Sequence, residues 1–337
     1  MKKVIKGWNH IPGIHCGSAA LRDVATFYGL PLSEPMCFGL GGGLGFFYSI
    51  DNEISPTRNI HLRGPDMEPG FFSLFTTEER KWEYEQDDSK ALQDVIDYID
   101  RDIPVLIQTD IFYLDYYNSS THFPGHIVVV SGYDAQKQEV YLSDTGFEGL
   151  QAVSFDNFKK SRSAKIKPYP LSNNWISVGG INTQNDLNEL IPLAIKSNAL
   201  KMLKGVKSPR GVSGVERILE LSKDIFNWKD AADWKWSFRY SYQVIQKRGT
   251  CGAGFRWMYR DYLNEAKNYF DFEFTEQIAI KMDHIGNEWY ELSRFFKKIS
   301  EEEKPDSFLA ESSQRLFNIY TLEKNFYSEI AGYLQIL

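Results

Sequence analysis

Apolar positions change their period along the first half of the chain, and this change predicts two kinds of element. Residues 17–28 and 89–101 repeat apolar side chains every three or four positions, which is the spacing of one helix face. A Gly-Leu-Pro sequence at 29–31 would end the first helix. Short β-branched segments then predict strands at 104–109, 127–132 and 140–142, with a polar turn at 134–138. Helices followed by antiparallel strands indicate an α+β domain.

Beyond a linker-like stretch at 167–174, the helical period dominates. The predicted helices span 181–204, 214–226, 234–247, 255–270, 274–300 and 306–334, with a Gly- and Pro-containing break at 206–215. A chain of 337 residues usually forms more than one core. We therefore expect two domains, an α+β domain over residues 1–170 and an all-α domain over residues 171–337.

Composition and charge narrow the class of protein. Hydrophobic residues make up 42% and charged residues 25%, the balance of a soluble globular protein. Residues 1–170 hold 16 Lys and Arg against 23 Asp and Glu, whereas the second half is balanced, so the net charge of −7 lies entirely in the first half. A nucleic-acid partner is not expected, because such binders carry basic surfaces. The acidic half either attracts a cationic ligand or is a solvated acidic surface.

Three cysteines, Cys16, Cys37 and Cys251, are too few for a disulfide framework. The first residues lack the apolar stretch of a signal peptide, and no apolar run reaches the roughly 20 residues of a membrane helix. We expect a reduced, cytoplasmic protein with no membrane partner. The sequence leaves the oligomeric state open, a homo-oligomer included.

Cys16 stands at the start of the first predicted helix. Free backbone N–H groups and the helix dipole favour a thiolate at that position, and a thiolate is the form that attacks carbonyls. The alternative is that Cys16 is a small buried residue, as most free cysteines are. A metal site is not expected, because the spacing of His10, His15, Cys16 and Cys37 matches no zinc pattern.

A nucleophilic cysteine needs a histidine base and a group that orients the base. His126 opens one predicted strand and Asp144 follows the next. A turn at 134–138 would pair residues whose numbers add to about 271, which places His126 opposite Asp144. This pairing favours a triad over two unrelated strand ends, and His122 is a competing base. The Gly41-Gly42-Gly43 sequence lacks the residues of a phosphate-binding loop, so we interpret it as a close-approach loop.

Several short motifs resemble known families. Residues 16–29, with Cys-Gly-Ser-Ala-Ala-Leu and a closing Phe-Tyr-Gly, together with Gly125-His126, Gly132-Tyr133-Asp134 and Ser143-Asp144, resemble the papain-like bacteriocin-processing peptidases. Trp-Asn-His-Ile-Pro-Gly-Ile-His-Cys-Gly-Ser at 8–18 and Lys-Arg-Gly-Thr-Cys-Gly-Ala-Gly-Phe-Arg at 247–256 are similar to the butirosin biosynthesis protein H family. The resemblance implies a papain-like catalytic domain followed by a helical domain.

The resemblance also implies an activity: acyl transfer from an acyl carrier protein, or a small acyl thioester, to an amine-bearing small molecule. Cys16 would be the nucleophile, His126 the base and Asp144 its orienter. No cofactor is implied, although the donor can carry a phosphopantetheine arm. The peptidases place a glutamine six residues before the cysteine to form the oxyanion hole. Here His10 stands there beside Asn9, so either side chain, or the backbone N–H of Cys16, is a candidate donor.

Four residues are candidates for substrate binding. Asp110 and Tyr113 follow a predicted strand and precede His126, although Asp110 could equally cap a loop. Arg248 and Arg256 flank three glycines before a helix, an arrangement that could receive a carboxylate or a phosphopantetheine arm, or form a tight turn between helices. Cys251 stands where the family leads us to expect glycine.

Two other functions remain open at this point. A cysteine amidohydrolase or peptidase would use the same triad with water in place of the amine. A non-catalytic papain-like binding module would account for the missing oxyanion glutamine.

Overall fold

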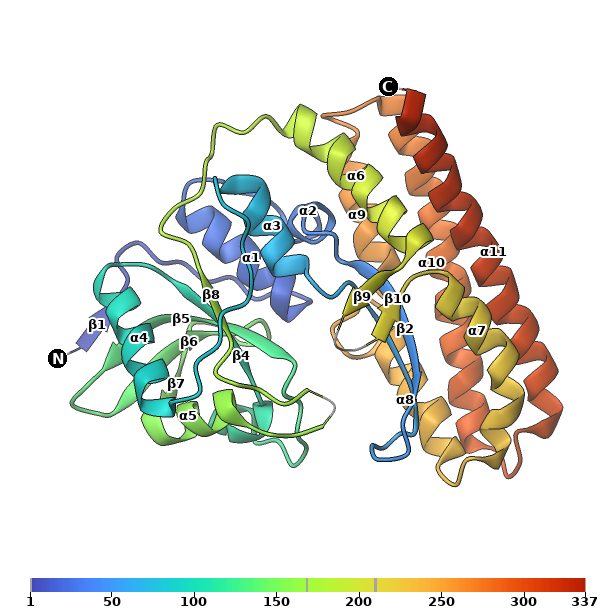
Figure 1. Ribbon diagram of the computed structural model, residues 1–337, viewed down its shortest axis with the longest axis horizontal. Coiled ribbons are helices and arrows are strands. Elements are labelled where there is room, and N and C mark those ends of the chain that lie inside the picture. Colours follow the sequence, from blue (N-terminus) through green and yellow to red (C-terminus); the bar gives the residue numbers. More distant parts are fainter. Residues whose placement is uncertain (1, 168, 209–210, 337) are drawn as a thin grey trace. The chain divides into compact units, whose positions relative to one another are not determined.

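The computed structural model describes residues 2–167, 169–208 and 211–336 (Figure 1). The chain forms two compact units, each built from two segments. One comprises Met1–Cys37 and Glu68–Asn185, and the other Phe38–Met67 and Asp186–Leu337. We call them the sheet unit and the helical unit. An α+β region with an antiparallel sheet, followed by a largely helical region, is thus confirmed.

The sheet unit is organised around six antiparallel strands in the order β7-β6-β5-β4-β8, with β1 also paired to β5. The strands are β1 Lys2–Val4, β4 Val105–Thr109, β5 His126–Asp134, β6 Glu139–Ser143, β7 Leu150–Ser154 and β8 Trp175–Ser177. The helices are α1 Cys16–Phe27, α3 Met67–Phe75, α4 Asp88–Asp100, α5 Phe155–Ser163 and the 3₁₀ turns η1 Ile111–Tyr113 and η2 Asp115–Tyr117. Helix α2, Glu34–Leu40, spans the boundary between the units.

The sheet unit has a continuous apolar core. Val95 and Ile99 of α4 and Phe158 of α5 pack with the buried β-branched residues of β4 and β5, such as Val105 and Val128. Asp87 begins α4 by accepting hydrogen bonds from the backbone N–H groups of Ser89 and Lys90. Alternating side chains of β5 are buried on both faces, so this strand is the centre of the unit.

The helical unit contains a hairpin that the sequence pattern did not predict. Its strands are β2 Leu44–Ile50 and β3 Arg58–Arg63. In addition, β9 Val206–Ser208 pairs antiparallel with β10 Gly211–Ser213. The helices are α6 Leu187–Lys204, α7 Glu216–Asp224, η3 Ile225–Asp230, α8 Trp234–Gln246, α9 Arg256–Ala266, α10 Phe272–Glu301 and α11 Asp306–Ile336. The long helices α10 and α11 pack against each other (Figure 1).

The observed division of the chain into two units differs in two places from the predicted boundary at residue 170. The β2–β3 hairpin packs with the helices of its unit, where Phe46 lies 5.4 Å from Trp289 between ring centroids. Strand β8, beyond residue 170, returns to the edge of the sheet and pairs with β4. Both differences arise because apolar segments distant in sequence complete the cores. No helix among the described residues is long and apolar enough to cross a membrane.

Candidate functional site

Cys16 is the first residue of α1, where the unpaired N–H groups of the helix start favour negative charge. His15 caps this helix, because its side chain accepts a hydrogen bond from the backbone N–H of Ser18. Cys16 is partly exposed, whereas the next five residues of α1 are buried. The helix therefore presents this cysteine at its end while its body is fixed by packing.

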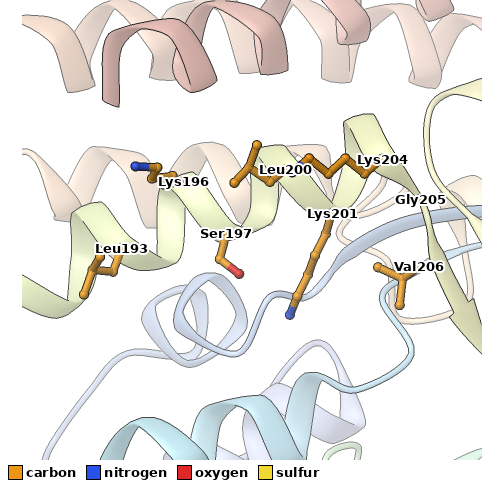
Figure 2. Close-up of a pocket in the computed structure, with 8 residues that line it drawn as sticks. All are labelled: Leu193, Lys196, Ser197, Leu200, Lys201, Lys204, Gly205 and Val206. Atoms are coloured by element: carbon orange, nitrogen blue, oxygen red, sulfur yellow. The ribbon is translucent and has the colours of Figure 1, made fainter. Parts of the chain in front are cut away.

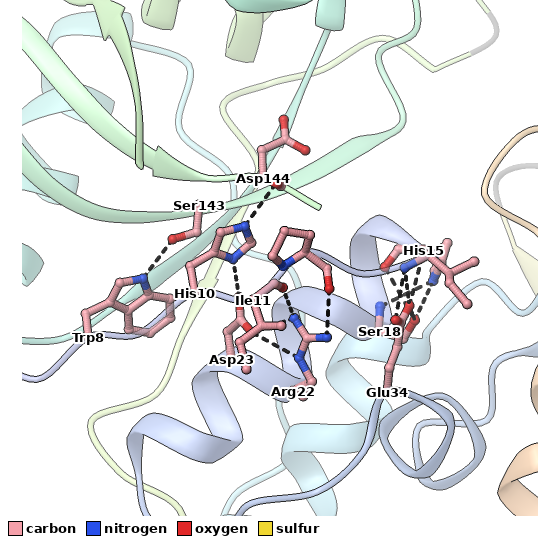
Figure 3. Close-up of polar contacts among 12 residues, drawn as sticks. Trp8, His10, Ile11, His15, Ser18, Arg22, Asp23, Glu34, Ser143 and Asp144 are labelled. Atoms are coloured by element: carbon pink, nitrogen blue, oxygen red, sulfur yellow. Dashed lines mark hydrogen bonds and ion pairs between the residues drawn. The ribbon is translucent and has the colours of Figure 1, made fainter. Parts of the chain in front are cut away.

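A buried carboxylate holds the chain just before the thiol (Figure 3). Glu34 accepts the backbone N–H of Ile14 at 3.0 Å, the backbone N–H of His15 at 2.7 Å and the hydroxyl of Ser18 at 2.9 Å. A Cβ on Gly13 would lie 2.7 Å from a Glu34 oxygen, so this close approach requires glycine. Sequence reasoning missed Glu34, since nothing in the spacing distinguishes it from a surface glutamate.

His126 and Asp144 lie together in the sheet unit. Nε2 of His126 is 2.9 Å from both carboxylate oxygens of Asp144, which is 1% exposed. The same histidine forms a side-chain hydrogen bond with Cys16. Because Nε2 faces Asp144, Nδ1 is the nitrogen left for the thiol. The three residues selected from the sequence are thus neighbours.

The predicted register, however, was wrong. The hairpin pairs Asp134 with Glu139 and, beyond a bulge between Val130 and Gly132, pairs Val129 with Ser143. The ladder therefore ends before His126, whose sheet partner is Thr109 of β4. The turn and the bulge together displace the pairing by one to two positions, which sequence arithmetic cannot detect. The two side chains meet beyond the end of the ladder.

Two tyrosines complete the surroundings of Asp144. The hydroxyl of Tyr116 donates to one carboxylate oxygen at 2.7 Å, and the hydroxyl of Tyr117 donates to the other at 3.1 Å. Tyr117 also lies 3.2 Å from Nε2 of His126. Both come from η2, between β4 and His126. The sequence predicts a loop near the site there, but not the contact of these hydroxyls with Asp144. The carboxylate is fully hydrogen-bonded, as a buried charge requires.

The electrostatics of the site favour a thiolate–imidazolium pair. Burial opposes ionisation of Cys16, but interactions with His15 and the hydrogen bond from His126 hold the pKa of the thiol well below its usual value. Burial also opposes a charge on His126, yet the charge and hydrogen bond of Asp144 raise its pKa to about 10. The pKa of Asp144 is lowered, since His126 outweighs the effect of burial. These directions favour a thiolate at Cys16 and an imidazolium at His126.

His10 and Asn9 were the candidate side chains for an oxyanion hole. Both ring nitrogens of His10 are occupied, one by Asp23 at 2.6 Å and the other by the backbone carbonyl of Asp144 (Figure 3). The backbone carbonyl of Phe147 also lies 3.0 Å from the second nitrogen. In this arrangement His10 has no N–H left to donate to a substrate. Asn9 is exposed, and the backbone N–H of Cys16 lies at the helix start.

The candidate substrate residues Asp110 and Tyr113 lie in the segment after β4. Asp110 is fully buried, caps η1 through the backbone N–H of Phe112, and lies 2.5 Å from Nδ1 of His122. Tyr113 is half-buried, beside Phe112 and His122. The competing base His122 is thus paired with Asp110, and the histidine at Cys16 is His126.

The two candidate arginines belong to the helical unit. Arg248 is exposed and donates to Gln243 at 2.8 Å. Arg256 is 0% exposed and pairs with Glu323 through two nitrogens, at 2.8 and 3.0 Å. This buried ion pair indicates a structural role for Arg256.

The glycine-rich sequence before α9 is a tight turn. A Cβ on Gly254 would lie 2.2 Å from Leu62, and Cys251 adopts a φ of 55°, in the left-handed region that favours glycine.

The helical unit also has an open cavity of about 340 Å³ along α6 (Figure 2). Lys196, Lys201 and Lys204 line it together with apolar residues such as Leu193 and Leu200. None of the candidate residues above lies in its lining. Among the described residues, no three His, Cys, Asp or Glu side chains are grouped to hold a metal ion.

Fold and site together define the class: an α+β unit with a Cys-His-Asp cluster at one sheet, joined to a largely helical unit. Residues 15–145 match the family described as Butirosin biosynthesis protein H, N-terminal, and residues 156–330 match Domain of unknown function (DUF4872). The chain belongs to this two-part family, and the predicted resemblance is confirmed. This membership suggests a role in biosynthesis of the butirosin kind. No curated protein matches the chain.

Proposed function

We propose that this protein is a cysteine-dependent acyltransferase that takes an acyl group from a thioester and delivers it to an amine. The observation that carries the proposal is the pairing of Cys16 with His126, whose pKa is raised to about 10 chiefly by Asp144 against the opposing effect of burial. A partly exposed thiolate beside a protonated base is the resting state of a nucleophile for acyl transfer. A papain-like fold for the sheet unit is part of this proposal.

In the first step the Cys16 thiolate attacks the thioester carbonyl. The carbonyl oxygen becomes an oxyanion, to which the backbone N–H of Cys16 or the side chain of Asn9 donates. The bond to the donor sulfur breaks, and His126 gives its proton from Nδ1 to the departing thiolate. The products are a Cys16 thioester and a free thiol on the donor.

In the second step a neutral amine attacks the Cys16 thioester. His126, now neutral, accepts a proton from the attacking nitrogen, and the Cys16 thiolate departs as the amide bond forms. The thiolate–imidazolium pair is thereby restored. Asp144 keeps the ring oriented through both steps, with Tyr116 and Tyr117 fixing its carboxylate.

The donor would be an acyl carrier protein or a small acyl thioester, and the acceptor an amine-bearing small molecule. Family membership supports this choice. Tyr113 and Arg248 stay candidates for contacts with these substrates, whereas Asp110 is buried, caps η1 and pairs with His122. A cationic acceptor agrees with the excess of acidic residues in the first half of the chain. Several of these acids already have structural tasks, since Asp87 caps α4 and Glu85 pairs with Lys90.

Intact-mass analysis after incubation with a panel of small acyl thioesters tests the proposal. We expect an acyl adduct on the wild type and on Cys251→Ala, the matched control for a second partly exposed cysteine, but none on Cys16→Ala. Added amines should then discharge the adduct to amides faster than water discharges it.

Two results would contradict acyl transfer to an amine. Discharge by water alone, unchanged by amines, would identify a cysteine hydrolase with the same residues. No adduct with any thioester, together with slow labelling of Cys16 by iodoacetamide, would identify a binding module.

A further inference from the structure

The segment at residues 8–15, which precedes Cys16, joins the two elements that carry the candidate site (Figure 3). On one side, Nε1 of Trp8 donates to the hydroxyl of Ser143 at 2.7 Å, and the backbone N–H of Gly13 donates to the carbonyl of Thr145 at 3.0 Å. Ser143 and Thr145 flank Asp144. On the other side, the segment runs directly into α1. The position of Asp144 relative to Cys16 therefore depends on contacts of this segment.

His10 is the ionisable residue at the centre of these contacts. Its Nδ1 lies 2.6 Å from a carboxylate oxygen of Asp23 on α1, and its Nε2 lies 3.1 Å from the carbonyl of Asp144 and 3.0 Å from that of Phe147. The side chain is only 4% exposed. Both nitrogens face acceptors, so both must carry a proton, and the ring is an imidazolium.

We propose that His10, in its doubly protonated form, is a positioning residue that fixes the loop of Asp144 against the helix of Cys16. The inference rests on the proposed function for the roles of Cys16 and Asp144. His10 does not touch the reacting atoms. Its contact with the main-chain carbonyl of Asp144 sets where the carboxylate of that residue meets His126.

The charged groups around His10 are consistent with an imidazolium. Asp23 faces it from α1, and Arg22 donates a charge-assisted hydrogen bond to the second oxygen of Asp23 at 2.8 Å. From the loop after β6 only main-chain carbonyls face the ring, since the Asp144 carboxylate binds His126, Tyr116 and Tyr117. Burial lowers the pKa of His10, but the hydrogen bond and charge of Asp23 outweigh it and raise the pKa above its ordinary value.

The raised pKa of His10 determines how its contribution to stability changes with pH. A histidine with a raised folded pKa contributes its full stabilisation below the unfolded value of about 6.5 and loses it as pH rises through the folded value. Deprotonation would remove one of the two donors and leave an acceptor nitrogen facing a carboxylate or a carbonyl. The contact between α1 and the loop of Asp144 should then weaken.

The test combines two measurements. Ring ¹⁵N chemical shifts of the unmodified protein should show both His10 nitrogens protonated near neutral pH. Iodoacetamide labelling of Cys16, read by peptide mass, is then followed across pH in the wild type, His10→Gln, Asp23→Asn, the double variant and the control His284→Gln on α10. Glutamine can donate toward only one of the two sides.

We expect His10→Gln to raise the pKa of the Cys16 thiol by about one unit, which moves the labelling profile to higher pH and slows labelling about tenfold at pH values below that pKa. Asp23→Asn should act in the same direction, the double variant should add little, and His284→Gln should match the wild type. A neutral His10 ring near pH 7 would overturn the proposal. So would a lower melting temperature with an unchanged labelling profile, because that result describes a merely structural contact. Labelling needs no acyl donor, so a changed profile without any acyl adduct would reject the proposed function alone.

Discussion

Nε2 of His126 lies at the same distance, 2.9 Å, from both carboxylate oxygens of Asp144. This bifurcated contact holds Nε2 against the carboxylate and leaves Nδ1 for the hydrogen bond with Cys16. The negative charge of Asp144 is also what outweighs burial and keeps His126 protonated. One contact thus determines both the orientation and the charge of the proposed base.

The ion pair predicts an unusual pH dependence for the thiol. Iodoacetamide labelling of Cys16 should already have reached its plateau at neutral pH, because the pKa of the thiol is lowered by His15 and His126 despite burial. In His126→Asn the labelling should titrate near the ordinary thiol value of about 8.5 and be slower at neutral pH by about tenfold or more. Cys251, resolved as a separate peptide in the same samples, is the internal control. Equal profiles in both proteins would contradict the ion pair.

The tyrosines of η2 should matter chiefly through the carboxylate of Asp144, to which both donate. Tyr116→Phe and Tyr117→Phe each remove one donor from the carboxylate, and a hydrogen bond to a charged group is worth about 1.5–3 kcal/mol. We expect lower stability in urea denaturation and a higher pKa of Asp144, with the larger effect at Tyr116, whose bond is shorter. Tyr113→Phe, from the neighbouring turn η1, is the matched control. A loss at Tyr113 as large as that at Tyr116 would count against this assignment.

Acid should destabilise the sheet unit by protonating the carboxylate of Asp144. The pKa of Asp144 is lowered in the folded state, chiefly by His126 acting against burial, so its stabilisation is present above the unfolded value of about 3.9. It is lost as pH falls through the folded value. Asp144→Asn should be less stable than the wild type near pH 7, and the difference should shrink at acidic pH. Thermal melts of both proteins across pH measure this, and a constant difference would refute it.

Local sequence rules located much of the site because they describe local structure. The helix at Cys16, its end near Gly29, and the strands that carry His126 and Asp144 all follow from period and turn residues. These elements were predicted to within a few residues: α1 begins at Cys16 rather than at residue 17. The nucleophile, base and orienter could therefore be proposed together.

The rest depends on contacts between distant segments, which no local pattern encodes. Glu34 lies 19 residues from the N–H of His15 that it binds, and Tyr116 lies 28 residues from Asp144. The bulge in β5 is invisible in a run of apolar residues, so the register was misplaced. His10 was selected because of its distance from Cys16 along the chain, but its partners Asp23 and Phe147 became known only from the fold.

Glu34 offers a test of how the segment before Cys16 is held. Alanine at this position would leave the N–H groups of Ile14 and His15 without the carboxylate that accepts from them. It would also remove one partner of the Ser18 hydroxyl, which still lies 3.1 Å from Nδ1 of His15. Each buried donor left unsatisfied costs about 1–3 kcal/mol. Glu34→Gln, which keeps one oxygen acceptor, should lose less stability than Glu34→Ala in urea denaturation and should also slow Cys16 labelling. Exposed Glu53 provides a control substitution, Glu53→Gln. Equal stability of Glu34→Ala and the wild type would show that water replaces the carboxylate.

A substitution at Arg256 tests whether this residue of the helical unit belongs to a structural ion pair or contacts a ligand. Its guanidinium binds Glu323 through two nitrogens, and Nε1 of Trp289 donates to the same carboxylate at 2.6 Å. Removing one partner of a buried ion pair costs about 3–5 kcal/mol, because the other charge stays buried and unpaired. Arg256→Met should therefore be strongly destabilised in urea denaturation.

The double variant Arg256→Met/Glu323→Leu should recover part of that loss, because neither charge then remains buried. Arg248→Met, which removes an exposed arginine from the same sequence motif, should change the urea midpoint little. If Arg256→Met instead kept the wild-type stability and weakened only the use of an acyl donor, the buried pair would not be structural, and Arg256 would have to leave Glu323 to bind the substrate.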